Sequence, residues 1–424
     1  MRLSPRIGLT ATLVVLVACG EATRPVQPGL RPSHDLILQS SNSNIVPGQY
    51  IVVFKDGVTD PDGLAQTLVS LYGGTLKHTY KSAIKGFAAV LSDAAVAALN
   101  AQSTLVDYIE PDQKGGPDGE TQQTPQSSSS SPASGSTTQQ MDASGDPWGL
   151  DRIDQRALPL SGTYTYTSTG AGVHVYMIDT GIWTQHPEFG GRADNVYDIA
   201  GLGGEDCWGH GTATAGIVGS ATYGVAKGVF LHGVRVYAEC STEEAGVPEG
   251  IQVQTSDVVA GVDWVTAHHL SPAVANLTVS LAPSTALTTA VHNLQNSGVF
   301  VAATAANHNA DACLEAAGAS GAFTVAASTK TDAKADFSNW GPCVSVYAPG
   351  VNIKSTWLLN QTMILSGTSF ASPHVTGVAA LYKATFGDAP ANVVAAWITS
   401  NATAGVITGN PSGTPNLLLF KSKL

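Results

Sequence analysis

Three residues far apart in the 424-residue sequence have the side chains needed for nucleophilic catalysis: Asp179, His210 and Ser369. Asp179 ends the apolar run HVYMID and is followed by Thr180 and Gly181, where the chain can turn sharply. His210 stands between two glycines in GHGTATAG, at the start of a run of small residues. Ser369 lies at the start of the helical run TSFASPHVTGVAALY. A hydroxyl in that position can be exposed while its own backbone amide points towards a developing anion.

Each of these residues also has an ordinary structural interpretation. An aspartate after a strand often caps a helix, a lone histidine is more often structural, and a serine at a helix start is a common N-cap. A serine hydroxyl is a poor nucleophile at neutral pH and needs an adjacent base. The catalytic interpretation therefore depends on whether the fold brings the three side chains together.

The pattern from Pro147 onwards predicts an α/β domain that would position these residues. Apolar strand runs without polar alternation are followed by alanine-rich helical runs. Such strands are buried on both faces, as in a parallel sheet covered by helices, and ligands bind at their carboxyl ends. The expected strands are GVHVYMID, GVFVAATA and AFTVAAS, and the expected helices are SDVVAGVDWVTAHHL and STALTTAVHNLQN.

A smaller α+β unit is predicted before this domain, at residues 48–113. QYIVVF, KGFAAVLS and VDYIEPD have the pattern of strands, and PDGLAQTLVSLYGG and DAAVAALNAQS have that of helices. Residues 114–146 are rich in serine, glutamine, proline and glycine, which leave nothing to bury. We expect this segment to be a disordered linker that proteases can cut.

Composition and charge argue against a disordered chain and against a nucleic-acid-binding protein. Hydrophobic residues make up 43% of the chain and charged residues 12%, which is typical of a globular protein. The formal net charge of -12 argues against a surface that follows phosphates. We therefore expect no nucleic-acid partner.

The N-terminus has the pattern of an export signal. Two arginines precede the apolar run IGLTATLVVLVA, which is shorter than the roughly 20 residues of a permanent membrane span. The run ends in LVAC, which resembles a bacterial lipoprotein box in which Cys19 would be lipidated. Ordinary signal cleavage near Ala22 is the alternative. We assign residues 1–19 to a signal peptide with a lipobox and 20–47 to a linker, in a secreted or extracellular protein whose precursor would be anchored through the Cys19 lipid.

Four further cysteines remain: Cys207, Cys240, Cys313 and Cys343. An even number in an exported chain favours two disulfides. A zinc site is the alternative, but no pair has CxxC spacing.

The segments IDTGI, GHGTATAG and GTSFASPHVTG, in the order Asp, His, Ser, resemble the three signatures of subtilisin-like serine peptidases. The runs PWGLDRIDQR, TYGVAKGV and FSNWG resemble the proteinase K and aqualysin branch. GQYIVVFKDGV, KGFAAVLS and VDYIEPD resemble the inhibitor-type propeptide of that family. The resemblance implies an α/β catalytic domain with a mainly parallel sheet flanked by helices at residues 147–424, preceded by a small α+β propeptide.

The resemblance also implies an activity. Ser369 would attack the scissile carbonyl, His210 would take its proton and Asp179 would orient the imidazole, in a serine endopeptidase that forms an acyl-enzyme. The alignment of GVFVAATAANHN places Asn307 in the oxyanion hole. Protein or peptide substrates and the chain's own propeptide are the implied partners, no cofactor is required, and a monomer is expected. The implied disulfides are Cys207 to Cys240 and Cys313 to Cys343.

The primary specificity pocket departs from the family pattern. The family usually has Ala-Gly-Asn where this chain has AAN, so the methyl group of Ala306, next to Ala305, would narrow the pocket. The opposite wall aligns with TVSL or, shifted by two residues, with SLAP, and Ser280 and Leu281 belong to it in either alignment. Small side chains should therefore be preferred just before the cut.

Asp151, Asp154 and Gln155 resemble half of a calcium site of the family, but the acidic second half is replaced by SGT. A structural calcium site and ordinary exposed carboxylates both remain open for these three side chains.

Two functions are compatible with the motifs. The first is an active endopeptidase made as a self-processing zymogen that cuts itself within the linker. The alternative is a catalytically weakened relative that binds peptides. Because Asp179, His210, Ser369 and Asn307 are all retained, we favour the first.

Overall fold

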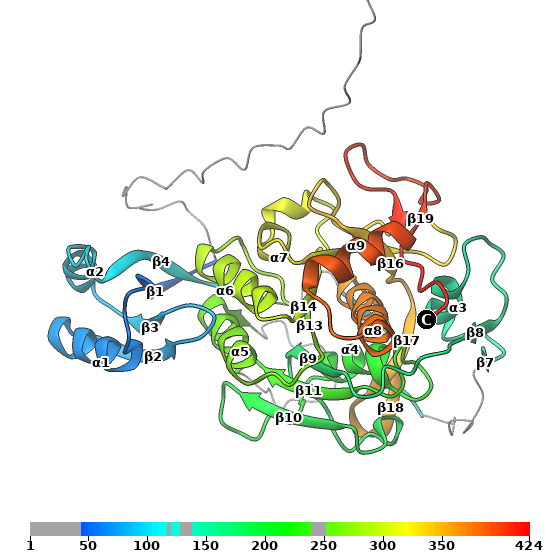
Figure 1. Ribbon diagram of the computed structural model, residues 1–424, viewed down its shortest axis with the longest axis horizontal. Helices are drawn as coiled ribbons and strands as arrows, with labels where there is room; N and C mark the ends of the chain where they lie inside the picture. The colour runs from blue at the N-terminus through cyan, green and yellow to red at the C-terminus, as the bar shows by residue number, and fades with distance from the viewer. Residues whose placement is uncertain (1–43, 117–119, 128–137, 239–251) are drawn as a thin grey trace, which may run out of the picture. The chain divides into compact units, whose positions relative to one another are not determined.

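A mainly parallel sheet is the centre of the larger domain in this computed structural model (Figure 1). Residues 44–116, 120–127, 138–238 and 252–424 are described, and they belong to one unit of the chain. Neighbouring strands of the central sheet run parallel, except for the pair β19 and β20. In sheet order the strands are β10 (Ala193–Asp198), β11 (Phe230–Arg235), β9 (His174–Asp179), β13 (Ala273–Leu277), β14 (Phe300–Thr304), β15 (Phe323–Ser328), β16 (Val346–Pro349), β20 (Leu417–Leu418) and β19 (Thr403–Ala404).

Helices cover both faces of this sheet. α4 (His210–Gly219) and α8 (Thr368–Phe386) pack in one hydrophobic core, and α5 (Thr255–His268) and α6 (Thr285–Asn296) pack in another. A glycine permits close packing of α8, since a Cβ at Gly377 would lie 2.5 Å from Val225. The other helices are α3 (Trp148–Asp154), η1 (Pro187–Phe189), η2 (Ala312–Leu314), α7 (Ala316–Ala319), η3 (Leu358–Asn360) and α9 (Ala391–Asn401).

The smaller N-terminal domain is an antiparallel sheet with two helices on it. Asp60 caps the first helix by accepting a hydrogen bond from the Gly63 amide, and Pro61 begins it. β12 (Val253–Gln254), a strand of the larger domain, extends this sheet along β4. The elements of the N-terminal domain are β1 (Ile45–Phe54), α1 (Pro61–Tyr72), β2 (Thr75–Tyr80), β3 (Gly86–Val90), α2 (Asp93–Asn100) and β4 (Val106–Gly115).

The segment expected to be a structureless linker differs from that expectation. β5 (Thr121–Gln122) and β6 (Gln126–Ser127) pair with β18 (Gln361–Ser366), which forms a hairpin with β17 (Ile353–Trp357). β7 (Thr138–Gln140) pairs with β8 (Thr163–Thr165). Pairing to a strand edge uses main-chain groups and needs no apolar side chain, so a polar composition does not exclude it.

The cysteines lie in both described and undescribed parts of the chain. Cys313 and Cys343 form the disulfide that the family resemblance implied. Cys207 is disulfide-bonded too, but its expected partner Cys240 and the lipobox residue Cys19 lie outside the described residues. Within the described ranges, no helix has both the length and the apolar character needed to cross a bilayer.

Candidate active site

Two of the predicted residues form a direct hydrogen bond at the carboxyl end of the parallel sheet. Asp179 is the last residue of β9, and His210 is the first residue of α4. The Nδ1 atom of His210 lies 2.7 Å from Oδ1 of Asp179, and both side chains are buried. The imidazole is stacked on the ring of Trp208, with centroids 5.2 Å apart. Its orientation is therefore fixed by one carboxylate and one aromatic ring.

Several hydrogen bonds hold the Asp179 carboxylate in place. The amide of Thr180 donates to Oδ1 at 2.7 Å, and the hydroxyls of Thr214 and Thr278 donate to Oδ2 at 3.1 and 2.5 Å. Because donors face both oxygens, the orientation of the Asp179 carboxylate towards His210 is fixed. Thr278 was expected only as part of a specificity-pocket wall, and this contact with Asp179 was not foreseen.

A second buried carboxylate, that of Asp206, organises the turn before His210. It accepts hydrogen bonds from the amides of Trp208, Gly209 and Thr212 at 2.8–2.9 Å. No sequence pattern indicated this role, because an aspartate in GEDCWGHG could equally lie in an exposed loop. Asp206 therefore positions the residues on both sides of His210.

Ser369 is the second residue of α8, and the ring of the next residue, Phe370, has its centroid 5.5 Å from that of the His210 imidazole. The Asn307 side chain is tied to the same helix start, because its Oδ1 accepts hydrogen bonds from the amide and the hydroxyl of Thr368, both at 2.8 Å. The four residues predicted from the motifs thus gather around the amino end of α8.

The second nitrogen of His210 faces a carboxylate from the N-terminal segment. Oε1 of Glu120 is 3.2 Å from His210 Nε2, and the Glu120 side chain is 5% exposed. Burial disfavours the charged imidazole, but the carboxylates of Asp179 and Glu120 outweigh burial and raise the pKa of His210 well above its ordinary value. Glu120 was not among the predicted site residues.

The N-terminal segment is also bonded to the catalytic domain before and after Glu120. Before Glu120, the amide of Gly116 donates to the carbonyl of Ser280 at 3.2 Å. After Glu120, Thr121 pairs with Ser366 of β18. Ser280 and the edge of β18 thus both pair with extended backbone of this segment, and we refer to these two pairing edges together as the groove.

The predicted pocket residues fall into two groups. Ser280 and Leu281 border the groove, since a Cβ at Gly115 would meet the Ser280 carbonyl at 2.0 Å and the Leu281 side chain at 2.9 Å. Ala306 is buried with a φ of 71°, a left-handed conformation that favours glycine. Ala305 is buried in a hydrophobic cluster of the core, and its place in the pocket wall stays a prediction.

An additional acid lies at this wall. The Glu315 carboxylate is 3.4 Å from the Ser280 hydroxyl and 2.9 Å from Nδ1 of His308, the residue after Asn307. Its position at the groove depends on a turn that follows Cys313, and no sequence motif indicated it.

The side chains of the suggested calcium site do not fit a calcium ion. Asp151 accepts hydrogen bonds from the Ser161 hydroxyl at 2.9 Å and the Gly162 amide at 2.6 Å. Asp154 is paired with the buried Lys421 ammonium at 2.8 Å. Gln155 uses its side-chain oxygen to accept from the Ser161 amide at 2.9 Å. Because N–H and O–H donors and a lysine already face these oxygens, a cation would have no set of free ligands there. The described residues contain no cluster of three or more His, Cys, Asp or Glu that could hold a metal. Calcium binding by Asp151, Asp154 and Gln155 stays a prediction that these contacts do not support.

The N-terminal domain is docked on α5 and α6 by carboxylates. Asp112 accepts from the amide and hydroxyl of Ser256 at 3.0 and 2.6 Å, at the start of α5. Glu110 accepts from the amide of Thr285 at 3.0 Å, at the start of α6. Carboxylates at helix amino ends satisfy free amides and complement the helix dipole. Asp263 of α5 accepts in return from consecutive amides of the N-terminal domain, those of residues 81–83.

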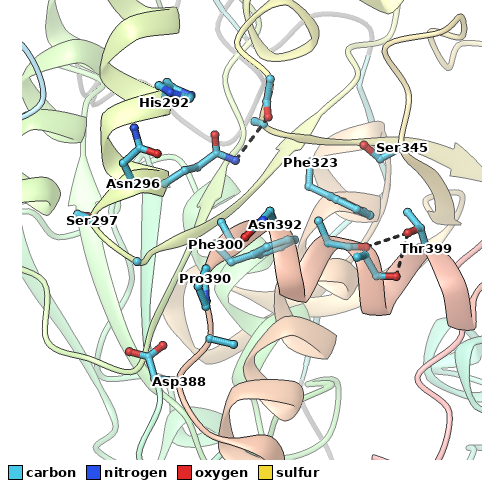
Figure 2. A pocket seen from close by; sticks show the side chains of 18 residues that line it. His292, Asn296, Ser297, Phe300, Phe323, Ser345, Asp388, Pro390, Asn392 and Thr399 are labelled. Carbon is cyan, nitrogen blue, oxygen red and sulfur yellow. Dashed lines mark hydrogen bonds between the residues drawn. The ribbon is translucent and has the colours of Figure 1, made fainter. Parts of the chain in front are cut away.

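A separate pocket of about 810 Å³ lies at the opposite end of the parallel strands, where β14 and β15 begin (Figure 2). Phe300 and Phe323 line it, with ring centroids 5.5 Å apart, together with Asn296, Asn392 and Asp388. Since Asp179 is at the other end of the parallel strands, this pocket is not part of the triad.

The chain matches the Subtilase family over residues 170–417 and Peptidase inhibitor I9 over residues 49–115. It is 41% identical to the extracellular serine proteinase of Thermus sp. (strain Rt41A), over 96% of this chain and 97% of that protein. It is 35% identical to Proteinase R of Parengyodontium album, over 91% of this chain and 92% of that protein. A crystal structure of a cold-adapted subtilisin-like serine proteinase is 42% identical and matches with a TM-score of 0.60, covering 65% of this chain and 97% of the other.

The fold, the sheet-end site and these matches define a serine proteinase with an N-terminal inhibitor domain. The chain belongs to the subtilase family, and its N-terminal domain is an I9 propeptide. The resemblance to the proteinase K and aqualysin branch is confirmed by these relatives.

Proposed function

We propose that this chain is the self-processing precursor of an exported serine endopeptidase in which Ser369 is the nucleophile, His210 the base and Asp179 the group that orients it. The observation that carries the proposal is the 2.7 Å bond between His210 and Asp179 beside the amino end of α8. A hydrogen-bonded carboxylate keeps the proton on Nδ1 and leaves Nε2 to accept the serine proton.

The proposed reaction proceeds through an acyl-enzyme and needs no cofactor. Ser369 Oγ bonds to the scissile carbonyl carbon as its proton passes to His210, and His210 then gives that proton to the leaving amine. The side chain of Asn307, fixed by Thr368, and the amide of Ser369 at the start of α8 are the groups assigned to the developing oxyanion. A water molecule then loses a proton to His210 and attacks the acyl-enzyme, which releases the carboxylic acid product and restores Ser369.

Self-processing is supported by the course of the N-terminal segment. The amide of Gly116 is bonded to Ser280, Glu120 contacts the catalytic base His210, and Thr121 pairs with Ser366. We therefore place the cut between Gly116 and Thr121, a narrower range than the whole linker. The cut would separate the propeptide from the catalytic domain, and the I9 domain would then act as an inhibitor until it leaves.

The proposed organisation of the precursor keeps the boundaries derived from the sequence. Export would depend on the signal, and lipidation of Cys19 would anchor only the propeptide half, so cleavage would release the enzyme. The substrates are proteins or peptides, and we infer a monomer that does not bind nucleic acid. The proposed parts are 1–19 signal peptide with lipobox, 20–47 linker, 48–113 propeptide, 114–146 linker and 147–424 catalytic domain.

Labelling with a fluorophosphonate probe tests the proposal. The processed protein should be labelled at Ser369, and the Ser369→Ala variant should be unlabelled and remain a full-length precursor in a host free of other proteases. An unlabelled but folded and processed protein would instead indicate a peptide-binding relative. Normal maturation of Ser369→Ala would exclude self-processing.

A further inference from the structure

The carboxylate of Glu120 contacts the catalytic base His210, although no step of the proposed mechanism needs a negative charge there. Its Oε1 is 3.2 Å from Nε2 of His210, the nitrogen that must accept the proton of Ser369. We propose that Glu120 is an autoinhibitory residue of the precursor, which holds His210 in its charged form and so sets the pH at which self-processing begins. The inference rests on the proposed self-processing.

The local packing keeps Glu120 at this position. Its neighbour Thr121 is paired with Ser366 on the edge of β18. A Cβ at Gly367 would lie 3.0 Å from Cγ of Glu120, so the glycine before Thr368 makes room for this side chain. The other carboxylate oxygen, Oε2, is buried and has no hydrogen-bond partner among the described residues.

A buried carboxylate with one partner is stabilised when that partner is positively charged. Removing a carboxylate from water is unfavourable, and an adjacent cation offsets that cost. The only group within hydrogen-bond distance of Glu120 in the described part of the chain is His210, which becomes a cation on protonation. The contact therefore favours the imidazolium.

The other charged groups around His210 also favour its protonated form. Asp179 faces Nδ1 at 2.7 Å, Glu120 faces Nε2, and Asp206 lies behind the turn that carries Trp208. The remaining neighbours, Trp208 and Phe370, are aromatic and uncharged. Acids thus surround the imidazole, in line with its raised pKa.

The sign of the pH effect follows from the proton that catalysis must move. An imidazolium cannot accept the proton of Ser369, so cleavage requires neutral His210. Because Glu120 raises the pKa of His210, the neutral form appears only at higher pH in the precursor. Once cleavage has occurred and the segment has left the groove, this restraint is removed and the mature enzyme works at lower pH than its own maturation.

The first experiment follows cleavage of the purified full-length precursor across pH ~5 to ~9, the range in which histidines titrate. Glu120→Gln keeps the shape and the acceptor oxygen but removes the charge. We expect its processing midpoint to move down by about one pH unit, with cleavage about tenfold faster below the wild-type midpoint. Glu120→Ala should shift the midpoint in the same direction. Asp107→Asn, which removes an exposed acid from β4, is the matched control and should keep the wild-type profile.

The second experiment measures His210 directly, by NMR titration of its ring in the uncleaved Ser369→Ala precursor with and without Glu120→Gln. The pKa of His210 should be lower in the double variant. Equal midpoints and equal titrations would overturn the role of Glu120 while leaving self-processing intact. If no precursor cleaves itself although Ser369 reacts with the fluorophosphonate, self-processing is wrong, and the NMR titration still decides whether Glu120 holds His210 charged.

Discussion

Replacement of Ala306 by glycine should change both substrate preference and stability, because this alanine has an unfavourable backbone conformation. Its φ is 71°, and the residue is buried. The conformation is imposed from both sides: the Ala306 amide donates to the Thr304 hydroxyl at 3.3 Å, and its carbonyl accepts from the Asn339 amide at 3.0 Å. The methyl group therefore stays in place although glycine would suit the backbone better.

Two opposing effects decide the stability of Ala306→Gly. A left-handed alanine costs about 1–2 kcal/mol relative to glycine, which the substitution recovers. The extra freedom of glycine in the unfolded chain costs about 0.4–1 kcal/mol. The variant should therefore be as stable as the parent or more stable by about 1 kcal/mol, whereas a buried alanine in an ordinary strand loses about 0.5–1 kcal/mol on the same change. Ala326→Gly in β15 is that matched control.

The effect on specificity comes from the space that the methyl group fills. Excess volume in a close-packed site typically costs about 1–3 kcal/mol, and about 1.4 kcal/mol corresponds to a tenfold change in rate. The ratio of kcat/KM for a substrate with phenylalanine before the cut to that for one with alanine should rise about tenfold in Ala306→Gly. It should not change in Ala326→Gly.

Two peptide substrates that differ only at the residue before the cut, together with thermal unfolding of each variant, are sufficient for the assay. A flat ratio would mean that Ala306 does not shape the pocket, and the assignment of Asn307, its neighbour, would then be in doubt. A loss of more than about 1 kcal/mol in stability would refute the backbone argument, since recovery of the left-handed cost should offset the entropy of glycine.

Two further substitutions test how the propeptide is held and how Asp179 is supported. Asp263→Asn weakens the charge-assisted bonds to the amides of residues 81–83. The propeptide should then bind about 1.4 kcal/mol more weakly, and activity should appear about tenfold sooner after processing; an unchanged lag relative to Asp107→Asn would contradict this. Thr278→Val removes a hydroxyl that donates to Asp179 at 2.5 Å, and kcat should fall about tenfold or more with KM unchanged; a change confined to KM would assign Thr278 to substrate binding instead.

The sequence predicted those parts of the fold that a short motif or a hydrophobic period specifies. The strands around HVYMID and FVAATA and the helices α5 and α6 lie where periodicity placed them. β2 was not predicted. Its sequence TLKHTY is polar because His78 and Tyr80 contact Asp257 and Ser256 of the catalytic domain instead of a core of their own.

The residues that the sequence did not indicate are those whose role depends on distant partners. Glu120 meets His210 from 90 positions away, and Thr278 meets Asp179 from 99 positions away. Asp154 was indicated by the sequence, but its partner Lys421, from the C-terminal end, was not. Composition describes each such residue alone, so it cannot distinguish an exposed acid from one that faces a catalytic base.

The two sides of the groove hold the N-terminal segment unequally, which determines what leaves first after the cut. On the N-terminal side of the proposed cleavage site, β4 belongs to a folded domain whose Glu110 and Asp112 bind the starts of α6 and α5. On the C-terminal side, β5 and β6 have two residues each and pair only with β18. A main-chain hydrogen bond contributes about 1 kcal/mol net, so these short pairs open readily, while the propeptide leaves only when many contacts break together.

The new amino terminus should therefore leave the groove while the propeptide still blocks the other half. Hydrogen exchange in the freshly cleaved complex provides the measurement: the β18 amides that face β5 and β6 should exchange fast, and the β4 amides slowly. The reverse order would mean that the carboxylate contacts do not hold the propeptide. If the predicted order holds, release of the propeptide limits the appearance of activity. A propeptide that still occupies one of the two strand edges is enough to keep an extended substrate from binding.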